Sequence, residues 1–191
     1  MFRFLSSPLG RMFLLSLALY VLSTLVGYEA STAQGNSATS SASLQALAQL
    51  FAPLAAMEPP LMMVVIFLNN SIKAFVVIAL GFTFGVIPFI FLTVNGLITG
   101  LVLGMVGSLA GPRLALAALA PHGVIEIPAL LLASALGFMV ARAVVRRIAG
   151  REARLGHEFK NSMGLYLKVV LPALFVAAAV EAFVTPIFIG K

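Results

Sequence analysis

A run of apolar residues about twice as long as a membrane-spanning helix restricts this chain more than any other feature. The run covers residues 61–110, whereas a spanning α-helix needs only about 20 predominantly apolar residues. It therefore predicts two helices, and shorter apolar runs at residues 9–27, 123–145 and 165–189 predict one helix each. The composition agrees, because only 9% of the residues are charged, compared with about 25% in soluble domains. We expect an all-α, polytopic membrane helical bundle with five transmembrane helices.

The long run must reverse its direction, and residues 84–88 (FGVIP) are the best place for a turn. Proline cannot donate the hydrogen bond that a continuing α-helix needs, and the residue before it avoids helical dihedral angles. Gly85 adds the backbone freedom that a reversal requires. We therefore predict helices over residues 61–84 and 87–109.

A second division of the same run competes with this one. Asn69 and Asn70 would interrupt the first helix, leaving a half-helix over residues 61–72 and a span over residues 74–95. The two divisions assign different depths in the membrane to Lys73. The depth of this lysine therefore depends on where the chain turns.

Basic residues flank the apolar runs unevenly and predict how the helices are oriented. Arg3 and Arg11 precede the first run, whereas residues 29–60 contain two acidic residues and no Lys or Arg. Six further basic residues lie at or between the ends of the last two spans: Arg142, Arg146, Arg147, Arg151, Arg154 and Lys160. Because basic residues concentrate on the cytoplasmic side of membrane proteins, we expect a cytoplasmic N-terminus and an external segment at residues 29–60. Five spans then place the C-terminus outside.

These patterns divide the chain into three sections. Residues 1–28 form an N-terminal transmembrane anchor, residues 29–60 an external section, and residues 61–191 a four-helix membrane domain. Within the external section, the small polar residues 30–43 predict a flexible Ser-rich loop. Apolar residues at helical spacing follow it and predict a short amphipathic helix on the outer membrane surface or against the bundle: Leu44, Leu47, Leu50, Phe51 and Leu54. Residues 146–162 alternate basic and acidic side chains, as a solvated helix does.

Ionisable and amide side chains inside the predicted spans are candidates for a functional site, because such residues are costly in lipid and usually face a bundle interior. This intramembrane polar cluster consists of Asn69, Asn70, Lys73, Asn95, His122, Glu126 and Glu181. Two interpretations remain open. In the structural one, Lys73 pairs with Glu126 or Glu181 and serves folding. In the functional one, these three residues line a polar path, or bind an ion, a proton or a headgroup, in the outer half of the membrane.

Small residues at helical spacing predict close helix packing. On the fourth predicted helix, Ala129, Ala133 and Gly137 share a face with Glu126, so we expect this face at a tight helix interface. Elsewhere, GxxxG spacing recurs, and the glycines could pack within one bundle or form the interface of a homodimer. The predicted helix-packing glycines are Gly81, Gly85, Gly96, Gly100, Gly104 and Gly123.

The residues and motifs that the sequence lacks argue against several classes of function. There is no cysteine, no aspartate, and no motif of a serine hydrolase, zinc protease, P-loop NTPase or dinucleotide-binding enzyme. We therefore expect a protein that is not an enzyme and has no cofactor. His122 and Glu126 share a helix face, but a zinc site needs three or four ligands. The net charge of +6 lies mostly beside the apolar runs, which indicates membrane topology and not nucleic-acid binding.

Three motifs follow one another in the predicted four-helix domain. They are Phe67-Leu68-Asn69-Asn70, then Asn95-Gly96 with Gly100, then Pro121-His122-Gly123-Val124-Ile125-Glu126. Their order and spacing resemble the stage II sporulation protein M family over residues 60–189. By this resemblance, the family's signature positions are matched by Asn69, Asn70, Asn95, Gly96, His122, Gly123 and Glu126.

The resemblance implies an integral protein of the inner (cytoplasmic) membrane. In spore formers the namesake belongs to an engulfment complex, in which it helps to localise and anchor two peptidoglycan-degrading partners. We therefore expect a scaffold or anchor for partner proteins, with cell-wall remodelling enzymes as one class of partner. The alternative is a small channel or transporter for an ion, a proton or a solute. The expected partners are the lipid bilayer, membrane or cell-wall enzymes, and a second copy of the chain.

Overall fold

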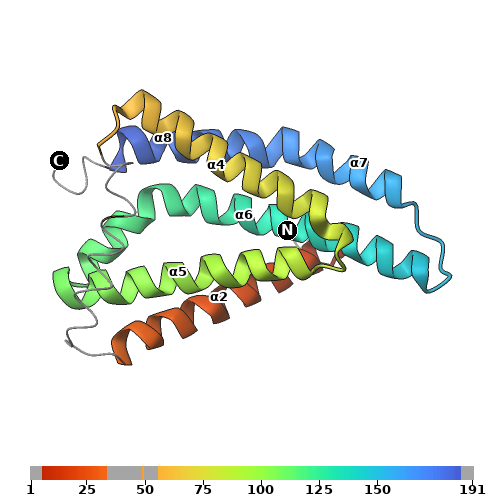
Figure 1. Cartoon of the computed structure of the whole chain (residues 1–191), viewed down its shortest axis with the longest axis horizontal. Helices are drawn as coiled ribbons and strands as arrows, with labels where there is room; N and C mark the ends of the chain where they lie inside the picture. Colours follow the sequence, from red (N-terminus) through yellow and green to blue (C-terminus); the bar gives the residue numbers. More distant parts are fainter. Residues whose placement is uncertain (1–5, 34–48, 50–55, 186–191) are drawn as a thin grey trace.

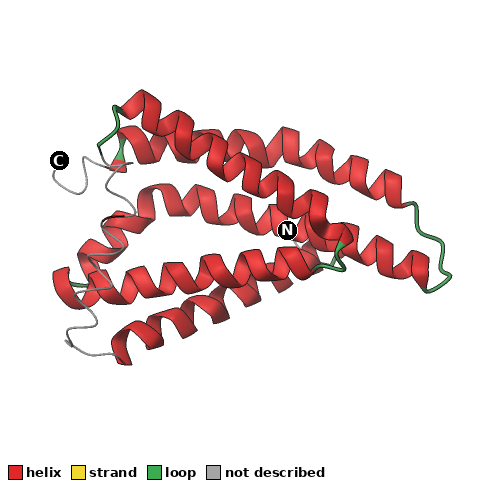
Figure 2. Ribbon diagram, viewed as in Figure 1, coloured by secondary structure: helices red, strands yellow, loops and turns green. Residues whose placement is uncertain are grey.

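The computed structural model describes residues 6–33, 49 and 56–185. The regular elements in these residues are all helical, and five helical segments are long and apolar enough to cross a membrane, which confirms the predicted fold class. The five segments alternate in direction and lie side by side, with their connections at the two ends of the bundle (Figures 1 and 2). The elements are α2 (Pro8–Ala33), α4 (Pro59–Ala79), η1 (Leu80–Phe82), α5 (Val86–Ala110), α6 (Pro112–Ile148), α7 (Leu155–Leu165), η2 (Tyr166–Val170) and α8 (Leu171–Phe183).

The long apolar run reverses where the first of the two divisions predicted. The turn occupies residues 83–85, between η1 and α5. Phe84 and Gly85 have φ angles of 56° and 85°, in the left-handed region that reverses a chain within a few residues. The Thr83 hydroxyl supports the turn by donating a hydrogen bond to the Leu80 carbonyl oxygen (2.7 Å).

The alternative division is wrong, because α4 runs without interruption through Asn69 and Asn70. The two amides contact each other, with Asn69 Nδ2 donating to Asn70 Oδ1 (3.4 Å), and the helix continues beneath them. Lys73 consequently lies nine residues before Phe82, the last residue of η1. That separation is about 14 Å along a helix, in a hydrocarbon layer about 30 Å thick, so Lys73 lies near the middle of the membrane.

α6 forms the centre of the bundle. Its spanning segment, Gly123–Ile148, is the most buried of the five spans. It lies between a pair formed by α2 and α5 and a pair formed by α4 and α8 (Figure 1). Ala129, Ala133 and Gly137 are buried, which confirms that this face forms a tight interface. The core packed between α4, α6 and the last spanning helix consists of Ala74, Ile78, Ala129, Leu130, Ala133, Leu136, Tyr166, Val170 and Leu174.

Two helices differ from their predicted ends on the side of the bundle opposite the α4–α5 turn. α6 begins at Pro112, eleven residues before the predicted start of the span at Gly123. Gly111, with a φ angle of 87°, reverses the chain directly after α5, and proline is favourable at the first helical position. α2 extends to Ala33, so the first residues of the predicted Ser-rich loop are helical. The predicted amphipathic helix at residues 44–54 lies outside the described residues, apart from Gln49.

The last spanning helix starts at Leu155, earlier than predicted, and continues to Phe183. The expected solvated helix over residues 146–162 is therefore divided between the end of α6, a loop and the start of α7. Within the long helix, η2 is a π-helical turn that ends just before Pro172. Proline lacks the N–H for the preceding turn and its ring crowds a carbonyl there, and a wider turn accommodates both effects.

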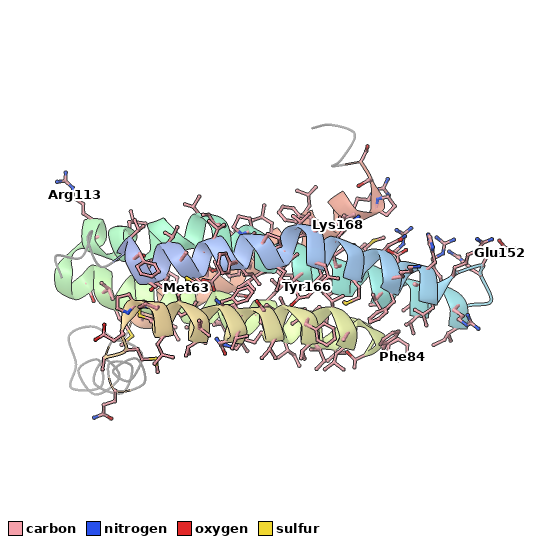
Figure 3. All side chains as sticks on the ribbon, turned by 90° about the horizontal axis from the view of Figure 1, so that it is seen from above. Met63, Phe84, Arg113, Glu152, Tyr166 and Lys168 are labelled. Carbon is pink, nitrogen blue, oxygen red and sulfur yellow. The ribbon has the colours of Figure 1, made fainter. Side chains whose placement is uncertain are left out.

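Charged side chains distinguish the two ends of the bundle. The α6–α7 hairpin extends past the α4–α5 turn (Figure 1), and it carries the basic residues Arg142, Arg146, Arg147, Arg151, Arg154 and Lys160. Arg113 and Glu152 mark the opposite ends in Figure 3. Toward the end that carries Arg113 lie Glu29, Glu58 and Glu181. One end is therefore basic, and which side of a membrane it occupies stays a prediction.

Candidate functional site

Lys73, Glu126 and Glu181, the ionisable residues of the predicted cluster whose side chains are described, lie in three separate parts of the bundle. Lys73 and Asn95 line a groove between α4 and α5. Glu126 lies beside α2. Glu181 lies near the end of α8. The arrangement therefore divides the predicted cluster into three local environments, each with its own neighbours.

The groove opens between the two arms of the α4–α5 hairpin, and we call it the hairpin groove. The arms lie close together at the turn and diverge away from it (Figure 1), and the space between them has a volume of about 380 Å³. Lys73 and Asn95 are its polar lining residues, and each lies nine residues from the end of its helix at the turn. They are therefore at a similar height in the membrane. The apolar lining residues are Val76, Val77, Ile87, Ile90, Phe91, Val94 and Ile98.

The Lys73 ammonium group has no hydrogen bond or ion pair within the described part of the chain. The predicted pair with Glu126 or Glu181 is not formed, because Lys73 faces α5 across the groove while the two carboxylates lie in other interfaces. Across the groove, Asn95 uses its Nδ2 to donate to the Phe91 carbonyl oxygen of its own helix (2.7 Å). A lysine at the centre of a spanning helix costs about 2.5–3.5 kcal/mol on insertion scales. The hairpin groove therefore contains a cation that no described residue neutralises.

The second polar region lies between α2, α5 and α6, and Tyr20 is its central residue. Thr99 donates its single hydroxyl hydrogen to the Asn95 carbonyl oxygen (2.9 Å). Tyr20 is therefore the donor in its own hydrogen bond with the Thr99 hydroxyl (2.8 Å). The Glu126 carboxylate lies close enough to Tyr20 to interact with it electrostatically. These interactions join three partly buried side chains between the helices, where polar groups are less costly than in lipid.

Close packing of α2 on α5 accounts for the glycine stripe. A Cβ atom at Gly96, Gly100 or Gly104 would overlap atoms of α2, and one at Gly27 would overlap the backbone of α5. Small residues allow two helix backbones to approach this closely. α2 of the same chain therefore covers the stripe, so these glycines give no support to a homodimer.

The remaining predicted residues have the following places. Thr185 donates to Glu181 Oε2 (3.3 Å) near the end of α8. His122 belongs to α6, but its side chain is not among those described. Gly81 packs against the Gly137 backbone, Gly85 against Phe138, and Gly123 is buried. Among the described residues, no group of three or more His, Asp or Glu side chains is placed to hold a metal ion.

Tyr166 is a contact residue that the sequence patterns did not identify. It is buried in η2, and its hydroxyl donates to the Ser71 carbonyl oxygen of α4 (3.0 Å). The hydrogen bond joins the π-helical turn to the neighbouring helix in a buried position. The sequence did contain one indication of this contact, a tyrosine within an apolar run. A buried phenolic hydroxyl needs a hydrogen-bond partner, so a tyrosine in such a run predicts a contact of this kind.

Comparison with known proteins places most of the chain in one family. The sequence profile of the family described as stage II sporulation protein M matches residues 15–186. The match begins inside α2, so it extends further toward the N-terminus than the three motifs do. An uncharacterised protein of Methanocaldococcus jannaschii is 29% identical over 123 residues, which cover 62% of this chain and 68% of that protein. No solved structure matches the chain.

Proposed function

Because the chain belongs to the stage II sporulation protein M family, we propose that it is a non-enzymatic membrane scaffold that holds partner proteins in the cell membrane. The proposed partners carry a transmembrane helix of their own, and cell-wall remodelling enzymes are one such class. The observation that supports this most is Lys73, which has no ion-pair partner among the described residues and lies in the hairpin groove near the middle of the membrane.

The hairpin groove has properties suited to binding a helix. Its walls are apolar side chains from two spanning helices, and several of them are exposed, including Ile90, Val94 and Ile98. A partner helix with an Asp or Glu near its middle would place a carboxylate opposite Lys73. The attraction between the two charges is strong where water is excluded, so the pair would offset the cost of Lys73 in lipid. Asn95 would offer an amide at the same height.

Transport of an ion, a proton or a solute is the alternative function, and it has less support. A permeation path needs polar groups in series across the membrane. Lys73, Glu126 and Glu181 instead lie in three different environments. In the proposed orientation, the basic end and the N-terminus lie in the cytoplasm and the C-terminus is external.

Replacing Lys73 by leucine tests the scaffold proposal. Leucine keeps an apolar side chain in the groove but removes the charge that a partner carboxylate would meet. We expect the tagged Lys73→Leu variant, purified in mild detergent, to retain roughly tenfold less of the proteins that accompany the wild type. The proteins lost should carry Asp or Glu near the middle of a transmembrane helix, and changing that residue to the amide should produce the same loss.

Lys168→Leu is the matched control, because Lys168 is exposed in a spanning helix and lies outside the hairpin groove. This variant should retain the wild-type partners. Self-association alone in several detergents, or equal losses in both lysine variants, would contradict the scaffold proposal. Ion or proton flux in liposomes that disappears in Lys73→Leu would support transport instead.

A further inference from the structure

A pocket at the basic end of the bundle has a different chemistry from the hairpin groove. Its volume is about 310 Å³, and it lies between the start of α2, the end of α6 and the start of α7. Arg142 and Arg146 project from α6, and Arg154 directly precedes α7. We call this space the arginine pocket. Its other lining residues are Pro8, Met139, Ala143, Glu152, Ala153, His157 and Glu158.

The guanidinium groups of the three arginines in this pocket have no partner among the described residues. Within residues 6–33 and 56–185, none of their guanidinium groups makes a hydrogen bond or an ion pair, although Glu152 and Glu158 line the same pocket. Arg142 is only partly exposed, whereas Arg146 and Arg154 are exposed. A guanidinium group presents five N–H donors in a planar fork that fits phosphate oxygens. Three such groups against two carboxylates leave one excess positive charge, which a phosphodiester anion would balance.

The position of the pocket indicates where such a phosphate would come from. Met139, Arg142 and Ala143 belong to the last turns of the spanning segment Gly123–Ile148, whereas Glu152 and Arg154 lie in the loop beyond it. The pocket is therefore at the boundary between hydrocarbon and water, with apolar residues toward the membrane. Basic pockets between transmembrane helices at this level bind anionic lipid headgroups.

We propose that the arginine pocket binds the phosphate of an anionic membrane lipid. Arg142, Arg146 and Arg154 hold the phosphate oxygens, and the acyl chains run along Met139 and Ala143. The chemistry that the pocket recognises is a phosphate ester, and its apolar wall favours a lipid over a soluble phosphate. Bound lipid would connect the start of α2 to the α6–α7 hairpin. This inference does not depend on the hairpin groove or on the scaffold function.

Native mass spectrometry of the full chain, released from detergent, tests the assignment. Phosphatidylglycerol and phosphatidylcholine with the same acyl chains serve as the two probes. We expect the wild type to retain phosphatidylglycerol preferentially, and Arg142→Gln and Arg146→Gln to bind it roughly tenfold more weakly, as loss of a charge-assisted hydrogen bond predicts. Arg147→Gln is the control, because Arg147 is exposed at the same end but does not line the pocket. It should change binding less than roughly twofold.

Three results would overturn the assignment. The first is equal retention of the two lipids by the wild type. The second is an equal loss of phosphatidylglycerol in Arg146→Gln and Arg147→Gln, a comparison that remains informative if Arg142→Gln does not fold, because Arg146 is exposed. The third is inorganic phosphate that binds as tightly as phosphatidylglycerol and displaces it, since the ligand is then a soluble phosphate. Phosphatidylglycerol that stays bound in millimolar phosphate supports the lipid.

Discussion

Gly100 sets the distance between α2 and α5 at the scale of a single residue. A Cβ atom there would overlap the Thr24 carbonyl oxygen and the Tyr28 nitrogen. These are backbone atoms of a helix, so they cannot rotate away as a side chain can. Gly107 lies in the same helix, and a Cβ atom there would meet nothing within 4 Å. Substitutions at the two positions therefore distinguish the effect of packing between helices from the effect of glycine on the stability of its own helix.

We expect Gly100→Ala to lower the free energy of unfolding by about 1–3 kcal/mol, because the added methyl group forces two packed helices apart. Gly107→Ala should leave it unchanged or raise it by up to about 1 kcal/mol, because alanine is the better helix former. Denaturant titrations in detergent micelles, followed by circular dichroism, measure both values. Equal destabilisation by the two substitutions would contradict the close packing of α2 on α5.

The residues that the sequence could not identify are those with distant partners. The small-residue stripe on α5 indicated that a backbone approaches, but a GxxxG pattern does not say which helix supplies it. Tyr20 and Tyr166 each lie in an apolar run, and their hydroxyls bond residues 79 and 95 positions away along the chain. No local pattern encodes such a separation. For the same reason, the sequence identified the polar residues but could not predict that Lys73, Glu126 and Glu181 lie in three separate parts of the bundle.

At the scale of elements, α2 is packed as a member of the bundle. It contributes Tyr20 to the polar region at α5 and α6, and its backbone lies against the glycine stripe. The family match also begins inside it, at residue 15. An apolar run predicts that a helix spans the membrane, but it does not predict how closely the helix packs. We therefore expect α2 to bind the other four helices without a covalent connection.

A split protein tests this expectation. Residues 1–33, which contain α2, and residues 56–191 are expressed together as two separate fragments. Because independently inserted helices associate through close packing, the α2 fragment should co-purify with the larger fragment. Gly100→Leu should reduce its recovery roughly tenfold, and Gly107→Leu should not. If the two wild-type fragments do not co-purify, α2 is only a membrane anchor and does not pack stably on the other four helices.

The sequence predicted the helices better than it predicted their ends. The α4–α5 turn was identifiable because Gly85 and Pro88 both act against a continuous helix. Gly111 and Pro112 carry a similar signal at the start of α6, but the apolar stretch from which the span was predicted begins later. Pro172, in contrast, does not mark a helix end, because a π-helical turn just before it allows the helix to continue. The length of an apolar run indicates which residues cross the membrane. The helix that contains the run can continue beyond the membrane wherever packing and capping allow.

At the scale of the whole molecule, the lengths of the apolar runs were enough to predict a five-span bundle but not its arrangement. The central position of α6 leaves α4 and α5 in contact with different neighbours, and this separation opens the hairpin groove between them. The groove lies near mid-membrane, whereas the arginine pocket lies at the basic end. A partner helix and an anionic lipid would therefore occupy different levels of the bundle and need not compete.

Photo-crosslinking in intact membranes measures most directly whether a partner helix occupies the hairpin groove. A photoreactive amino acid is placed at Val94, which is exposed in the groove, or at Val176, which is exposed on α8 outside it. We predict that position 94 crosslinks to a protein with an acidic residue in its transmembrane helix, that Lys73→Leu reduces this product roughly tenfold, and that position 176 does not form it. Crosslinks from position 94 to lipid alone, or the same protein product from both positions, would contradict a helix-binding groove.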